Sequence, residues 1–84
     1  MATANDWVRQ ILAKSQEQPM STEEVLKSLE RYAGSGDRAL ARVQAVLEYI
    51  DAELVERRGG MVMRDLWSTV ADYQEKVQEA QAAA

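Results

Sequence analysis

The side chains that most often carry chemistry in proteins are scarce in this sequence. Its 84 residues include no histidine and no cysteine, which removes the commonest general base and the thiolate. Serine cannot form a Ser–His pair here, and the Glu23-Glu24 pair is typical of a helix start. The Gly34-Ser35-Gly36 segment lacks the lysine and the length of a phosphate-binding loop. The sequence therefore predicts no enzyme, no cofactor and no metal site.

Arginine, in contrast, is concentrated in one part of the chain. Residues 37–64 hold five arginines, balanced by five acidic side chains. At helical spacing, Arg38, Arg42 and Tyr49 share an exposed stripe with two alanines, between which a partner surface could approach closely. The alternative interpretation is a solvated helix face with stray arginines. The pattern alone leaves both interpretations open.

Length and charge limit the class of protein. A single domain of 84 residues buries only roughly 60–65% of its unfolded surface, so a partner or a second copy would help to stabilise it. The net charge of −4 argues against non-specific nucleic-acid binding, but it does not exclude a local basic face. No apolar run approaches the ~20 residues of a membrane span, and the first residues lack the pattern of a signal peptide. We expect a soluble, cytoplasmic protein.

Two helices are predicted in the first half of the chain. The first covers residues 5–17, with Asn5 as its N-cap and an apolar face at i,i+4 spacing. The second begins at a capping box in which the Ser21 hydroxyl accepts from the Glu24 amide and the Glu24 carboxylate reaches back to the cap. It runs to about Ala33, where a glycine-containing turn ends it.

A third helix is predicted after this turn, with Ser35 or Asp37 as its cap. Trp7 and Trp67 lie at helical spacing from other apolar residues, which predicts core positions for both. The predicted apolar side of the third helix consists of Leu40, Val43, Val46, Leu47 and Ile50.

The glycine pair Gly59-Gly60 allows two structures. In one, residues 54–58 and 61–64 are the strands of a β-hairpin around a Gly-Gly turn. In the other, the third helix continues to about Arg57 and the glycines lead into a fourth helix, which gives an all-α four-helix hairpin bundle. Residues 65–82 are helical in both. The sequence pattern does not separate the two.

The order of these elements resembles a winged helix-turn-helix domain of the type common in prokaryotic transcription regulators. The resemblance covers residues 5–67. It rests on ILAKSQEQPMSTEEVLKSLERY as the first two helices, AGSGDRALARVQAVLEYIDAE as the turn and recognition helix, and LVERRGGMVMRDL as the wing. It implies a mainly α fold with a small β-hairpin, divided into a winged helix-turn-helix domain at residues 1–65 and a C-terminal helix at residues 66–84.

The resemblance also implies double-stranded DNA as a partner. It would place Arg38, Arg42 and Tyr49 against the major groove, and Arg57 and Arg58 of the wing near phosphates or the minor groove. The C-terminal helix is similar to the dimerisation helices that several such regulators append, which implies a homodimer. The residues expected at that dimer interface are Leu66, Val70, Tyr73 and Val77.

Two functional hypotheses follow. The first is a small DNA-binding protein that regulates transcription or replication through its third helix and wing. The alternative is a non-catalytic protein–protein interaction module, either a winged-helix adaptor or an all-α dimer, without DNA binding. The acidic balance, the long apolar seams and the small core favour the alternative.

Overall fold

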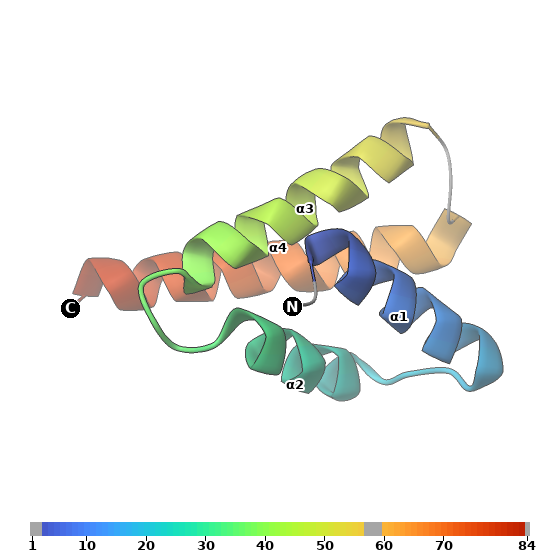
Figure 1. Cartoon of the computed structure of the whole chain (residues 1–84), viewed down its shortest axis with the longest axis horizontal. Coiled ribbons are helices and arrows are strands. Elements are labelled where there is room, and N and C mark those ends of the chain that lie inside the picture. Colours follow the sequence, from blue (N-terminus) through green and yellow to red (C-terminus); the bar gives the residue numbers. More distant parts are fainter. Residues whose placement is uncertain (1–2, 57–59, 84) are drawn as a thin grey trace.

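Four α-helices build the part of the chain that the structure describes (Figure 1). The structure is a computed structural model, and it describes residues 3–56 and 60–83. The helices are α1 (Ala4–Glu17), α2 (Thr22–Ala33), α3 (Ala39–Val55) and α4 (Gly60–Ala83). Helices α3 and α4 run in opposite directions and pack along each other, α1 packs on α3, and α2 contacts both α3 and α4.

Helix α1 begins at a reciprocal cap. The Thr3 hydroxyl accepts a hydrogen bond from the Asp6 amide at 3.2 Å, and an Asp6 carboxylate oxygen accepts one from the Thr3 amide at 3.2 Å. The predicted cap at Asn5 is wrong by two residues, because Asn5 already lies within the helix. At the other end Gln18 is extended, as the residue before a proline prefers, and α1 stops there as the sequence predicts.

Helix α2 begins and ends where the sequence predicts. The Ser21 hydroxyl accepts from the Glu24 amide at 3.2 Å and donates to the Glu24 carboxylate at 3.3 Å. After the helix, Gly34 adopts φ 74° and ψ −170°, a conformation nearly restricted to glycine. Its amide donates to the Glu30 carbonyl at 2.8 Å, which closes the last turn of α2.

Helix α3 starts later than predicted. Its N-cap is Arg38, and no side chain makes a capping hydrogen bond there, so the predicted caps Ser35 and Asp37 do not act. The turn is held by backbone instead, with the Ala39 amide donating to the Gly36 carbonyl at 3.1 Å.

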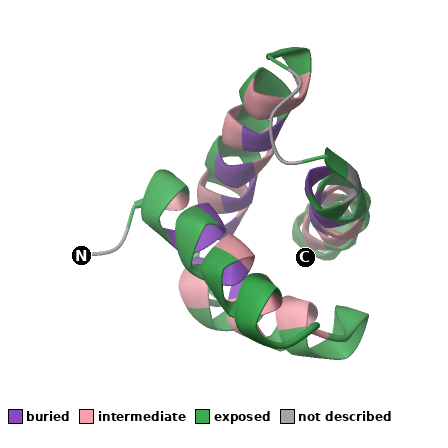
Figure 2. Cartoon of the chain, turned by 90° about the vertical axis from the view of Figure 1, so that its right-hand side faces the viewer, coloured by how far each residue is buried: buried purple, intermediate pink, exposed green. Residues whose placement is uncertain are grey.

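All four helices contribute to one core, and their buried residues face the middle of the molecule (Figure 2). Trp7 occupies its expected place, where its indole N–H donates to the Ser28 hydroxyl at 3.0 Å and its ring stacks on Tyr32. No buried side-chain polar atom among the described residues lacks a hydrogen-bond partner. The buried core residues are Trp7, Val8, Ile11, Leu29, Ala33, Ala39, Val43, Val46, Ile50, Met63, Leu66 and Val70.

The predicted β-hairpin is wrong for every described residue in it. Residues 54 and 55 are the last turn of α3, and residues 61–64 lie in the first turns of α4. The helical spacing of Met63, Leu66 and Val70 places all three in the core, whereas an isolated two-stranded hairpin of such short strands is barely stable in water. The described residues therefore have the all-α architecture of the alternative prediction.

Helix α4 crosses the predicted domain boundary between residues 65 and 66. Met63 and Leu66, on either side of that boundary, belong to the same core. Residues 78–83 continue the helix and are exposed.

Candidate interaction groove

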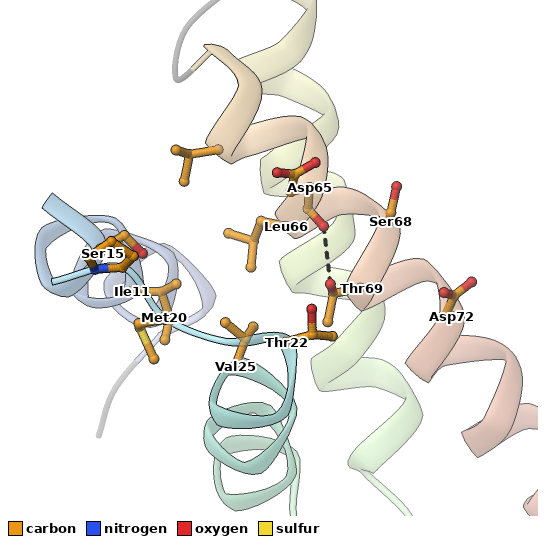
Figure 3. Close-up of a pocket in the computed structure, with 12 residues that line it drawn as sticks. Ile11, Ser15, Met20, Thr22, Val25, Asp65, Leu66, Ser68, Thr69 and Asp72 are labelled. Atoms are coloured by element: carbon orange, nitrogen blue, oxygen red, sulfur yellow. Dashed lines mark hydrogen bonds between the residues drawn. The ribbon is translucent and has the colours of Figure 1, made fainter.

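A groove of about 650 Å³ separates α4 from the end of α1, the α1–α2 connection and the start of α2 (Figure 3). It exists because α1 and α4 both pack on α3 but contact each other little. Described residues that line it, here called the groove residues, are Ile11, Ser15, Pro19, Met20, Thr22, Val25, Val62, Asp65, Leu66, Ser68, Thr69 and Asp72.

The floor of the groove is apolar. Ile11 and Leu66 are buried, at 2% and 4% exposure, and belong to the core. Met20 and Val25 are half-buried from the opposite wall, and Val62 on α4 is 47% exposed. Val62, Met20 and Val25 therefore leave apolar surface accessible to solvent beside the core, a feature that can mark a binding surface.

Polar groups of the groove lie mainly along α4. Val62, Asp65, Thr69 and Asp72 follow at three- and four-residue intervals, which places them on one stripe of that helix. The Thr69 hydroxyl donates to the Asp65 backbone carbonyl at 3.1 Å, so its hydrogen is engaged by its own helix. Asp65, Ser68 and Asp72 are exposed. They form a polar rim, here called the α4 rim, beside an apolar floor.

The charge of the α4 rim has one sign. Among the described groove residues the charged side chains are Asp65 and Asp72, both acidic. A neighbouring hollow on the outer side of the α1–α2 connection carries both signs, with Lys14, Lys27 and Arg31 against Glu17 and Glu24. The negative bias is therefore a property of the groove and not of the whole surface around it.

The described residues among those predicted to bind DNA differ in how far they are exposed. Arg38 is exposed at the start of α3. Arg42 is half-buried, and its guanidinium donates to the Ala33 carbonyl at 3.1 Å, so it holds the end of α2. Tyr49 is half-buried and packs against the core. Arg57 and Arg58 lie outside the described residues.

The residues predicted to form a dimer interface lie within the core of one chain. Leu66 and Val70 are buried there, and Tyr73 and Val77 are half-buried against it. Partial burial, together with the nearby Glu30 carboxylate, raises the pKa of Tyr73 above its usual range. Dimerisation through these side chains stays a prediction, but Leu66 and Val70 have little surface left to give to a second copy.

Trp67 departs from its predicted core position. It is 37% exposed, and its indole N–H donates to an Asp51 carboxylate oxygen at 2.6 Å. This bond joins α4 to α3 on the side of α4 away from the groove. A charged acceptor makes such a bond stronger than a neutral one, although its exposure to water reduces the net gain.

Comparisons with known proteins give no family for this chain. No protein-family model matches it, and neither the curated proteins nor the solved structures contain a significant match. Nothing in these comparisons identifies a winged-helix domain.

Two further observations bear on the site. Among the described residues no group of three or more acidic, histidine or cysteine side chains is placed to hold a metal ion. Within the described part of the chain, no helix has both the length and the hydropathy needed to cross a membrane.

The groove was missed from the sequence, although part of its signal is present. Val62, Asp65, Thr69 and Asp72 form a second stripe on α4 beside the core stripe, but this stripe is mostly polar and is not distinguished by its pattern from an ordinary solvated face. The opposite wall carries no such signal, because Met20 and Val25 are ordinary apolar residues that flank a helix start.

Proposed function

We propose that the protein is a non-catalytic protein-interaction module that binds an amphipathic helix of a partner protein in the groove. The observation that carries this proposal is the apolar lining of the groove, in which the half-exposed Val62 and the half-buried Met20 and Val25 border a floor of buried core residues. Burying such a lining under a partner releases water from apolar surface, which is the main driving force of most protein association.

The length of the groove fits a short helix. Its α4 wall runs from Val62 to Asp72, which at 1.5 Å per residue is about 15 Å, or nearly three helical turns. A partner helix of that length presents apolar residues at i, i+3 or i+4 and i+7, the pattern used in helix-in-groove recognition.

A small molecule suits the groove less well. The volume lies within the range of ligand pockets, but such pockets enclose a few converging polar groups. Here Asp65, Ser68 and Asp72 are exposed at the rim, and the Thr69 hydroxyl is engaged by its own helix. The apolar floor with a polar rim is the anatomy of a protein interface.

DNA binding ranks second. The β-hairpin that carried that hypothesis is replaced by helix in the described residues, and Arg42 is engaged with the end of α2. Of the predicted DNA contacts, exposed Arg38 is the one that the described structure leaves on an open surface.

A selection experiment tests the proposal. A displayed library of random 16-residue peptides is panned on the full chain, and the enriched peptides are measured against Val62→Asp and Val55→Asp. Val55 is the matched control, because it is also an exposed valine at a helix end, at 79% exposure, and it is not a groove residue. Circular dichroism checks that both variants keep the helix content of the native chain.

We expect enriched peptides with apolar residues at helical spacing. Val62→Asp should weaken their binding about tenfold or more, because it puts a charge into the apolar contact, while Val55→Asp should leave it unchanged. Equal binding to both variants would overturn the proposed site. Retention of DNA fragments that is lost in Arg38→Ala, with no peptide selected, would favour the second hypothesis instead.

A further inference from the structure

The α4 rim gives the groove a preference for one charge. Asp65 and Asp72 stand on the same stripe of α4, seven residues apart, with Thr69 between them. Two helical turns separate them by about 10 Å along the helix axis. Neither carboxylate is buried, so both are free to meet a side chain from a partner that covers the apolar floor.

We infer that the partner helix is basic along one edge and carries two lysines or arginines seven residues apart that pair with Asp65 and Asp72. This inference rests on the proposed function and names the chemistry of the partner. A second helix laid along α4 has the same rise per residue, so basic residues at i and i+7 repeat at the spacing of the two aspartates. Apolar residues one helical turn beyond the basic residue that pairs with Asp65 then lie level with Val62.

Charge also argues against a second copy of this chain as the occupant. The chain has a net charge of −4, and residues 65–84 contain one lysine against four acidic side chains. A second α4 docked against the groove would bring like charges to the α4 rim, which costs energy at an interface. A basic partner would be attracted electrostatically to the α4 rim, whereas the acidic α4 of a second copy would be repelled by it.

The acidic part of the rim is short. Lys76 follows Asp72 by one helical turn and is not a groove residue, so the attraction for basic side chains is confined to the stretch between Asp65 and Asp72. Spacing of the partner's charges, and not only their number, should therefore determine affinity.

The test compares four designed helical peptides with the same apolar stripe. One carries lysines at i and i+7, one carries glutamines there, one carries glutamates there, and one has two lysines moved to the opposite face of the helix. Affinity for the full chain is measured by fluorescence anisotropy at low and high salt. The same series is run on Asp65→Asn/Asp72→Asn, on Glu48→Gln/Glu75→Gln, and on Val62→Asp.

The Glu48→Gln/Glu75→Gln variant is the matched control. It also removes two negative charges, but from exposed helix positions that are not groove residues. We expect the i,i+7 lysine peptide to bind about 3- to 10-fold more tightly than the glutamine peptide, as two exposed ion pairs allow. This preference should disappear in Asp65→Asn/Asp72→Asn, persist in the control, and shrink at high salt.

Each other outcome has a defined meaning. If the glutamine peptide binds as well as the lysine peptide, and Val62→Asp weakens both, the groove is an interaction site but the inferred partner charge is wrong. Equal binding of the two lysine peptides would overturn the assigned pairing with Asp65 and Asp72, because lysines on the opposite face cannot reach them. If Val62→Asp reduces self-association of the chain in analytical ultracentrifugation, and no peptide binds in place of the second copy, the occupant is a second copy and the inference fails.

Discussion

The two sides of α4 differ in how far they are closed. On one side Met63, Leu66 and Val70 are buried against the other helices, and Trp67 is tied to Asp51 of α3. On the other side Val62 and the α4 rim border an open groove, because α1 packs on α3 without packing closely on α4. The same helix thus supplies stability with one stripe and accessible surface with the neighbouring stripe. The groove exists because a contact between two helices is left unmade.

The largest expected effect is on the free energy of unfolding, when the same substitution is made on each side of α4. Val70 is fully buried and Val62 is 47% exposed, although both are valines on α4. Val70→Ala should lower the free energy of unfolding by about 2–3 kcal/mol, through lost burial and a residual cavity. Val62→Ala should change it by less than about 0.5 kcal/mol. Urea unfolding of both variants measures the difference, and equal losses would mean that the groove side is closed as well.

A change at the α2–α3 turn should have the next largest effect. Gly34 has φ 74° and ψ −170°, which other residues adopt at a cost, whereas Gly36 is not at positive φ and an added Cβ there meets nothing within 4 Å. Gly34→Ala should destabilise the chain by about 1–2 kcal/mol. Gly36→Ala should be neutral or stabilise it by a few tenths of a kcal/mol.

This pair of variants also tests the groove. The conformation of Gly34 sets the direction in which the chain continues from α2, one wall of the groove, toward α3. Peptide binding by Gly34→Ala should fall more than binding by Gly36→Ala when both are measured well below their Tm values. If both variants lost the same stability, the conformation assigned to Gly34 would be wrong.

A smaller effect is expected from the bond that joins α3 to α4. Trp67 donates to Asp51 at 2.6 Å on the closed side, but both side chains reach water. A double-mutant cycle with Trp67→Phe and Asp51→Ala should give a coupling free energy of about 0.5–1 kcal/mol. Peptide binding in the groove should not change. Additive single-mutant effects would show that this bond contributes no stability.

The smallest effect is expected at the start of α1. The groove is lined by residues farther along this helix, Ile11 and Ser15. Hydrogen bonds from the backbone and side chain of Thr3 lower the pKa of Asp6 from its usual value near 3.8. A lowered pKa means that the capping contribution is complete above the unfolded-state value and is lost as the pH falls through the folded-state value. Unfolding followed between pH 5 and pH 2 should therefore show a small loss at the acid end.

Asp6→Asn is the control for that experiment. It should remove this part of the pH dependence while the rest of the acid profile remains. An unchanged profile in Asp6→Asn would assign the loss to other carboxylates.

Much of the fold could be predicted from local chemistry. The Ser21–Glu24 cap, the stop before Pro19 and the glycine turn after Ala33 are each determined by adjacent residues, and all three are confirmed. The cap at Thr3 follows the same rule, with Asp6 in the place of glutamate, whereas Asn5, the predicted cap, lies inside the helix.

The choice at residues 54–64 could not be made locally. Leu54 and Met63 satisfy a strand pattern and a helix pattern equally, and the helix is favoured because Met63 reaches the core formed by other helices. The groove could not be predicted from local sequence patterns for the same reason. Its opening depends on how α1 sits against α3, which no short stretch of sequence encodes.

Leu66 is both a core residue and a groove residue. A partner that binds the groove recognises the folded chain and not the unfolded one, so occupancy and folding are thermodynamically linked. A bound partner should therefore raise the melting temperature by an amount that increases with the logarithm of its concentration divided by its Kd. Thermal unfolding could therefore be used to detect a bound partner, and substitutions of Leu66 should change both affinity and stability.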